Sequence, residues 1–148
     1  MFTKKSAFTV FIVFLSFGLL QCDQNGFNNN NPFLPNYNFS FDIDLNLPSY
    51  ANLQFAGNSE LISLPGAGVG GVIVFYNGSN YLAFDAACPN QVFTSCSVLN
   101  LNGAFATCPC DDVVYNLFTG LAEGDLQGYY PLKPYRIERN GSILRVFN

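Results

Sequence analysis

The sequence contains the stretch Tyr81-Leu82-Ala83-Phe84-Asp85-Ala86-Ala87-Cys88-Pro89-Asn90, an apolar run that ends in a cysteine–proline loop. A second loop of this kind, Cys108-Pro109-Cys110-Asp111, begins 20 residues after Cys88, and Cys96 lies between the two. A short apolar run rich in aromatic residues and bounded by turn residues is typical of a buried strand. We therefore expect a strand that leads into the first of two cysteine loops.

Alternation and turn residues indicate further strands. In the segment Tyr37–Leu47 every odd position is apolar and every even position is polar, which predicts a half-buried strand. Pro48 ends it, and we expect Leu53 with Phe55 to begin another. The runs Val72–Tyr76 and Tyr81–Phe84 flank Asn77-Gly78-Ser79-Asn80, whose residues tolerate positive φ, so these runs predict a hairpin.

A second hairpin is predicted at the C-terminal end. Tyr135–Glu138 and Ser142–Phe147 are joined through Asn140-Gly141, a strong short-range hairpin signal. The chain has 16 Phe and 8 Tyr, while charged residues make up only 11%. This composition favours a sheet-rich fold over a helical bundle. With 148 residues, we expect one all-β domain, a small antiparallel β-sandwich of eight to ten short strands.

Charge and glycine patterns argue against two classes of ligand. The formal net charge is −4, and removal of a leader with Lys4 and Lys5 would make it −6, so we expect no nucleic-acid binding. The stretch Gly66-Ala67-Gly68-Val69-Gly70-Gly71 has the spacing of a dinucleotide-binding motif. That motif requires a helix after the glycines, whereas a strand pattern follows here, so we interpret it as a flexible loop and expect no nucleotide.

The N-terminal part of the chain has the layout of an export signal. Residues 1–22 contain Lys4 and Lys5 and then an apolar run from Ala7 to Leu20, which is short for a membrane span. The sequence around Cys22 resembles a bacterial lipobox, in which the cysteine becomes the lipidated first residue of the mature protein. An ordinary secreted protein and an uncleaved anchor are the alternatives. Four other cysteines remain, an even number that suits pairing.

These features predict three segments. Residues 1–22 are the signal peptide with its lipobox cysteine, and residues 23–36 are an Asn- and Pro-rich tether that we expect to be disordered. Residues 37–148 form the β domain. We expect the protein in the cell envelope, held on a membrane through a lipid anchor on Cys22 and facing the periplasm or the cell surface.

The region from Leu64 to Val146 resembles the Rieske [2Fe–2S] family. The resemblance rests on the strand that enters Cys88-Pro89, on the second loop from Gly103 to Cys110, and on Tyr115–Gly120 after it. Pro131–Pro134 is similar to the proline-bearing loop that covers the cluster in the family. The resemblance implies the Rieske-like type of β-sandwich, with both cysteine loops at one end.

The resemblance also implies which residues occupy the ligand positions. A Rieske centre binds one iron through two cysteines and the other through two histidines. Cys88 and Cys108 match the two thiolate ligands, but Asn90 and Asp111 stand where the histidines belong, and the chain has no histidine. The family's Gly and Ser after the second histidine are replaced by Asp112 and Val113. We therefore interpret the site as degenerate and expect no conventional cluster.

Disulfides are the default state of the four cysteines, because export would place them in an oxidising compartment. Three pairings are open on the residues alone. High-potential Rieske proteins carry an extra cysteine in each loop that pair with each other, and Cys96 and Cys110 hold comparable places. The resemblance thus implies Cys96–Cys110, which leaves Cys88 with Cys108. The competing interpretation is a metal site, either zinc or a [2Fe–2S] cluster, with Cys88, Cys96, Cys108 and Cys110 as ligands.

The expected function is that of an exported, membrane-anchored Rieske-like lipoprotein that has lost its cluster and acts as a disulfide-stabilised structural or binding module. We expect no cofactor and an unknown envelope protein as partner. The alternative is an electron-transfer protein that binds a [2Fe–2S] cluster through non-standard ligands. An enzyme is not expected, because the chain has no histidine and its acids show no pairing that spacing establishes.

Overall fold

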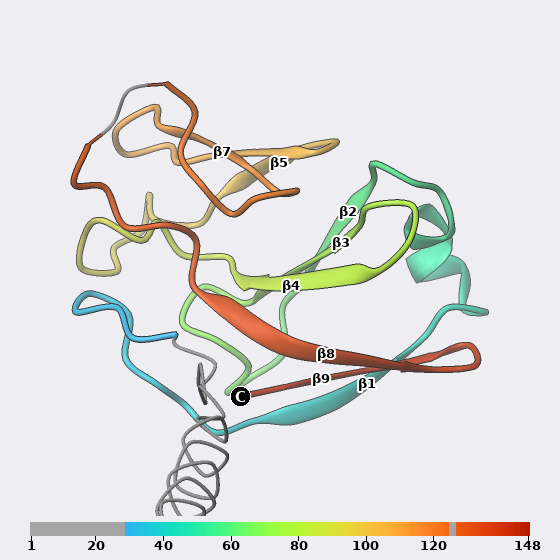
Figure 1. Ribbon diagram of the computed structural model, residues 1–148. Helices are drawn as coiled ribbons and strands as arrows, with labels where there is room; N and C mark the ends of the chain where they lie inside the picture. Colours follow the sequence, from blue (N-terminus) through green and yellow to red (C-terminus); the bar gives the residue numbers. More distant parts are fainter. Residues whose placement is uncertain (1–28, 125–126) are drawn as a thin grey trace, which may run out of the picture.

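The computed structural model describes residues 29–124 and 127–148, in which nine strands form two antiparallel sheets (Figure 1). The larger sheet has the strand order β1-β9-β8-β4-β3-β2. Its strands are β1 (Ser40–Asp44), β2 (Ser59–Ile62), β3 (Val72–Tyr76), β4 (Tyr81–Asp85), β8 (Pro134–Asn140) and β9 (Ile143–Phe147). The smaller sheet contains β5 (Asn100–Asn102), β6 (Phe105–Thr107) and β7 (Val114–Asn116). The predicted all-β antiparallel fold is confirmed.

The larger sheet curls where β4 meets β8, because only two residue pairs join these strands, Ala83 with Tyr135 and Phe84 with Pro134. As a result β1, β8 and β9 form one layer, β2, β3 and β4 form a second, and the smaller sheet forms a third (Figure 1). The two cysteine loops come together because each follows a strand that ends at the same side of the fold. They follow β4 and β6, where the second and third layers meet.

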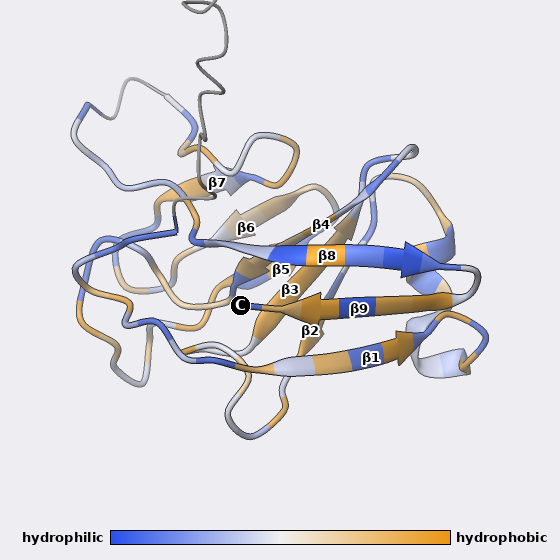
Figure 2. Ribbon diagram, turned by 60° about the horizontal axis from the view of Figure 1, so that its bottom comes forward, coloured by the Kyte–Doolittle hydropathy of each residue, from blue (hydrophilic) through white to orange (hydrophobic). Residues whose placement is uncertain are grey.

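Strand β3 lies at the centre of the fold and is buried on both faces. Val72 and Val74 belong to a core cluster with residues of β1, β8 and β9, whereas Ile73 and Phe75 belong to a second cluster with residues of the smaller sheet. All four side chains are 0% exposed. This double burial explains the continuous apolar sequence of β3, in contrast to the alternating hydropathy of β1 (Figure 2).

Both predicted hairpins are present. Strands β3 and β4 pair from Val72–Asp85 to Tyr76–Tyr81, and the Asn77 side chain accepts hydrogen bonds from the amides of Ser79 (2.9 Å) and Asn80 (2.8 Å) in the turn. Strands β8 and β9 pair across a turn in which Gly141 has a φ of 62°. Asparagine oxygens and glycine provide the local bonds and the positive φ that tight turns need.

Two local predictions were wrong or too long. Leu53 and Phe55 do not begin a strand, because Pro48–Gln54 forms a 3-10 helix (η2) that Pro48 opens and that buries Leu53. The strand predicted over 37–47 is limited to β1, since its partner β9 offers backbone groups only opposite Ser40–Asp44. Alternating hydropathy shows that a segment is half buried, but not where its hydrogen-bonded partner ends.

The predicted tether, residues 23–36, is described only from Asn29 onward, and this part lies against the domain. Leu34 is 1% exposed, and the Lys133 ammonium donates to the carbonyls of Leu34 (2.7 Å) and Pro35 (2.9 Å). The predicted signal peptide, residues 1–22 with Cys22, lies outside the described residues. Within residues 29–124 and 127–148, no helix is long and apolar enough to cross a membrane.

Candidate functional site

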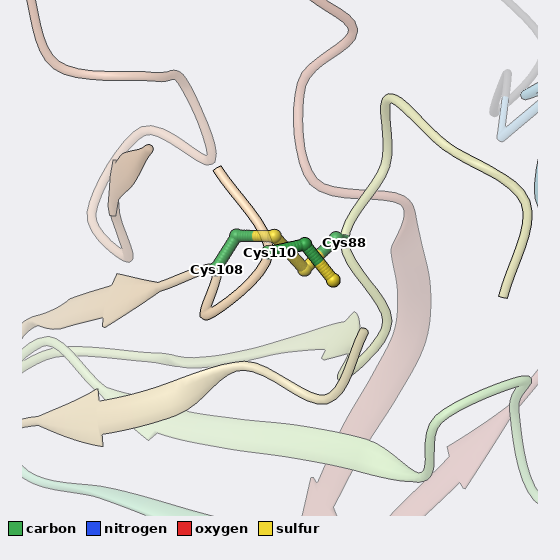
Figure 3. A group of neighbouring side chains, drawn as sticks. All are labelled: Cys88, Cys108 and Cys110. Atoms are coloured by element: carbon green, nitrogen blue, oxygen red, sulfur yellow. A yellow bond between two sulfur atoms is a disulfide. The ribbon is translucent and has the colours of Figure 1, made fainter. Parts of the chain in front are cut away.

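Four cysteines form two neighbouring disulfides at the end of the second and third layers. Cys88 and Cys108, which we call the inner disulfide, have Cα atoms 5.6 Å apart and are 1% and 0% exposed. Cys96 and Cys110, the outer disulfide, have Cα atoms 5.4 Å apart, with Cys110 half-buried and Cys96 exposed. These are the two pairs that the resemblance implied. The side chains of Cys88, Cys108 and Cys110 converge (Figure 3), and their sulfur atoms lie within 4.8 Å of one another.

The first cysteine loop leaves β4 and returns to it. The Cys88 amide donates to the carbonyl of Ser97 at 2.7 Å, and the Leu99 amide donates to that of Ala86 at 2.8 Å. Ser97 is 0% exposed, and its hydroxyl oxygen accepts hydrogen bonds from the Thr94 amide (2.9 Å) and the Gln91 side chain (2.8 Å). This hydroxyl organises the loop tip and places Cys96 at the surface.

The second cysteine loop is a tight turn between β6 and β7. The Cys108 amide donates to the Val113 carbonyl, and the Asp112 amide donates to the Cys108 carbonyl, both at 2.9 Å. Asp112 has a φ of 58° and is the only non-glycine residue with positive φ in the described part of the chain. Asparagine and aspartate tolerate this conformation better than other non-glycine residues. The turn therefore keeps a backbone suited to glycine although its sequence has an aspartate.

Asn90 connects the first loop to the segment around Tyr130. Its side-chain amide group donates to the Tyr115 hydroxyl (2.8 Å) and the Tyr130 carbonyl (3.2 Å), and its oxygen accepts from the Tyr130 amide (2.7 Å). Burial raises the pKa of Tyr115 to about 12, although the hydrogen bond from Asn90 acts in the opposite direction. Tyr115 thus stays a neutral phenol that accepts this bond at ordinary pH.

Asp111 makes its hydrogen bond within its own turn and not with the partners of Asn90. It is exposed, and its carboxylate accepts a hydrogen bond from the Val113 amide of its own turn at 3.2 Å. The Asn90 side chain is engaged with Tyr115 and Tyr130 on other segments. The two residues at the family's imidazole positions therefore act as local structural groups here.

These residues do not fit a [2Fe–2S] group of the Rieske type. The two thiolates that would hold one iron, Cys88 and Cys108, are bonded to each other. Neither an amide nor a carboxylate can replace imidazole as a neutral nitrogen ligand of the second iron. The donor set at this position therefore supports a disulfide and not the cluster.

A buried carboxylate that sequence analysis did not single out supports the first loop. Asp85 is 0% exposed, and its oxygens accept hydrogen bonds from the amides of Val69 (2.7 Å), Gly70 (3.0 Å) and Ala87 (2.8 Å) and from the Tyr135 hydroxyl (2.6 Å). The glycine-rich segment thus donates to an internal anion. A Cβ at Gly70 would lie 2.7 Å from the Ala87 amide nitrogen, so glycine is required there. The feature of the sequence that could have identified Asp85 is its place as an acidic residue at the end of an apolar strand.

Lys133 is the second buried polar group that was missed. It is 2% exposed, and its ammonium donates to the carbonyls of Leu34 and Pro35. The Asp85 carboxylate lies near enough to interact electrostatically with this ammonium. Burial lowers the pKa of the ammonium, while Asp85 opposes this shift. A lysine inside the otherwise apolar run Pro131–Tyr135 was the signal in the sequence. Because Asn31 also donates to the Pro89 carbonyl at 2.8 Å, residues 31–35 stabilise the first loop directly.

No protein-family model matches the chain, and no curated protein matches it. Similar solved structures include a chain of the complex of reduced oxygenase and oxidized ferredoxin in carbazole 1,9a-dioxygenase, at 22% identity over 62% of this chain and 82% of that chain, with a TM-score of 0.45. Another is the ferredoxin of carbazole 1,9a-dioxygenase from Nocardioides aromaticivorans IC177, at 18% identity over 62% and 86% of the two chains, with a TM-score of 0.41. The apo form of the quaternary ammonium Rieske monooxygenase CntA is 14% identical over 65% and 30% of the chains, with a TM-score of 0.46. These likenesses concern the fold alone.

Proposed function

We propose that this protein is a lipid-anchored binding module of the cell envelope, with a Rieske-like scaffold in which an inner and an outer disulfide replace the iron–sulfur cluster. The observation that carries the proposal is the bond between Cys88 and Cys108. Both are buried in the core cluster that the second and third layers share. There the disulfide serves as an apolar core element and joins two loops, which stabilises the fold by about 2–4 kcal/mol.

The membrane anchor is supported by the sequence of residues 1–22 and by the docked segment that follows. Six residues, 23–28, separate Cys22 from Asn29. A chain of this length spans at most about 3.6 Å per residue, or roughly 25 Å between the Cα atoms of Cys22 and Asn29. An acyl group on Cys22 would therefore hold the domain close to the membrane surface.

A binding role is supported by exposed apolar side chains on two loops at the disulfide end. Val92 is 69% exposed and Phe93 41% exposed on the first loop, while Tyr129 and Tyr130 are 42% and 40% exposed on the segment that Asn90 contacts. The hydrogen bonds between Asn90 and Tyr130 hold the two loops together. Large apolar side chains that gather on adjoining loops are typical of a protein-binding surface. We propose an envelope protein as the partner.

Site-specific photocrosslinking in cells tests this function. A crosslinking residue at Val92 should give a discrete adduct with one envelope protein, whereas the same residue at Leu61, which is exposed on edge strand β2, should not. Replacement of Cys22 by alanine should move the protein out of the membrane fraction and reduce the adduct. Equal crosslinking from both positions, or none from Val92, would contradict the binding role. A membrane fraction unchanged by Cys22→Ala would contradict the anchor.

A further inference from the structure

The arrangement of the two disulfides points to an exchange reaction between them. The outer disulfide joins an exposed residue, Cys96, to a half-buried one, Cys110. The Cys110 sulfur lies within 4.8 Å of both sulfurs of the inner disulfide. A thiolate must approach a disulfide sulfur directly to attack it, so a third sulfur close to a disulfide meets the first geometric requirement for exchange.

We infer that the four cysteines form a thiol–disulfide relay that carries reducing equivalents from a small dithiol at the surface to the buried inner disulfide. The inference goes beyond the binding role and does not depend on the lipid anchor. Its substrate class is an uncharged or cationic dithiol. Asp111 and Asp112 are exposed directly after Cys110 and would repel an anionic thiol.

The reaction begins at the outer disulfide. One thiolate of the dithiol attacks the exposed sulfur of Cys96, a bond forms between them, the Cys96–Cys110 bond breaks, and the electron pair leaves with Cys110 as a thiolate. The Thr94 hydroxyl oxygen lies 3.4 Å from the Cys96 sulfur and 3.9 Å from the Cys110 sulfur, and that of Ser97 lies 3.8 Å from the latter. The Ser97 oxygen already accepts two hydrogen bonds, so its proton remains free to be donated to Thr94 or to Cys110. Such a bond stabilises the departing thiolate.

The second step transfers the disulfide inward. The Cys110 thiolate attacks the sulfur of Cys88, the Cys88–Cys110 bond forms, and Cys108 leaves as a thiolate that takes up a proton. Attack on Cys108 would instead close a ring with only Pro109 between the cysteines, so Cys88 is the favoured target. The second thiol of the reductant then attacks the mixed disulfide, becomes oxidised, and releases Cys96 as a thiol. In total the dithiol loses two electrons and two protons, and the protein changes from two disulfides to one disulfide and two thiols.

Disulfide mapping of the full chain with Cys96→Ser is the direct test, since this variant leaves Cys110 as a free thiol beside the inner disulfide. The relay predicts that a thiol-blocking reagent labels both Cys108 and Cys110, because Cys88–Cys108 and Cys88–Cys110 interconvert. Chymotryptic cleavage after Phe93 and Phe105 separates Cys88, Cys96 and the peptide with Cys108 and Cys110, and fragmentation locates the label within that peptide. The matched control is Cys110→Ser, in which Cys96 should be the only one of Cys88, Cys96 and Cys108 that is labelled. Label on Cys110 alone in the Cys96→Ser chain would overturn the relay.

Reduction kinetics provide a second readout on folded protein. In the unmodified chain, dithiothreitol should reduce the buried inner disulfide at least about tenfold faster than in the Cys96→Ser, Cys110→Ser double variant, which has no relay. Both proteins should first show the same far-ultraviolet circular dichroism. If the double variant does not fold, acid quenching of the unmodified chain after partial reduction replaces it. A Cys88–Cys110 species trapped there supports the relay, and its absence together with free Cys96 and Cys110 overturns it.

Discussion

At the residue scale, the site depends on a few polar side chains that make several hydrogen bonds each. Asn90 occupies a position where the resemblance implies a ligand, yet it makes three hydrogen bonds that join loops. The buried Asp85 carboxylate accepts hydrogen bonds from two backbone amides of the glycine-rich segment. Both side chains satisfy hydrogen-bonding groups of other segments, so each connects parts of the chain that are distant in sequence.

Asp85→Asn should strongly destabilise the fold. The amide has one oxygen in place of two, so donors among Val69, Gly70, Ala87 and Tyr135 lose their acceptor inside the protein, and we expect the free energy of unfolding to fall by about 2–4 kcal/mol. Urea denaturation followed by circular dichroism measures the change. The control is Asp42→Asn, which breaks only an exposed ion pair with Arg145 and should cost less than about 1 kcal/mol. Equal losses in the two variants would contradict the role of Asp85.

Asp112 gives a prediction about backbone conformation. Its φ of 58° suits glycine, is tolerated by aspartate and disfavours a β-branched residue. Asp112→Val should therefore lower the free energy of unfolding by about 1–2 kcal/mol, whereas Asp112→Gly should leave it within about 0.5 kcal/mol. Thermal unfolding of both variants checks the difference. A valine variant as stable as the glycine variant would show that the turn has no such preference.

At the scale of elements, the segment 29–36 acts as a clamp on the disulfide end. It contributes a buried leucine, a hydrogen bond from Asn31 to the first loop, and two carbonyls to the Lys133 ammonium. Asn29 also donates to Asn148 at the end of the chain. A segment rich in Asn and Pro has little propensity for helix or strand, but tertiary contacts can still fix it. This is why composition alone did not predict its docking.

Lys133→Met should release this clamp. The substitution keeps most of the side-chain volume but removes the ammonium and with it both hydrogen bonds to the Leu34 and Pro35 carbonyls. We therefore expect the free energy of unfolding to fall by about 1–3 kcal/mol. Hydrogen exchange of the Leu34 amide, which is bonded to Asn31, should become faster. Arg145→Met, which removes an exposed cation, should leave that amide protected. Unchanged exchange at Leu34 in the Lys133 variant would show that other contacts hold the segment.

The sequence predicted elements best where local signals agree. The hairpins β3–β4 and β8–β9 combine alternating or continuous apolar runs with Asn–Gly turns, and both formed as expected. The pairing of β1 with β9 and the curl between β4 and β8 connect residues far apart in the chain, so no local pattern could reveal them. Leu53 and Phe55 were predicted to begin a strand, but Pro48 favours a helical turn, in which Leu53 is buried and after which Phe55 is exposed.

At the scale of the whole molecule, the all-β fold with two cysteine loops at one end could be predicted, and the two disulfides coincide with the pairs that the resemblance implied. The supporting network could not be predicted, because Asp85, Lys133 and Tyr135 meet only after the layers pack. Sequence therefore indicates where the candidate site lies, whereas its electrostatics and loop contacts are tertiary properties.

The most direct test of this account is the content of iron and acid-labile sulfide in the full chain, produced with cluster assembly supplied and purified without oxygen, together with its free thiols after denaturation. The account predicts a colourless, folded protein without iron or sulfide, in which Cys88, Cys96, Cys108 and Cys110 are all protected from a thiol reagent until a reductant is added. Iron and sulfide near two atoms of each per chain, with a visible absorption spectrum, would contradict it.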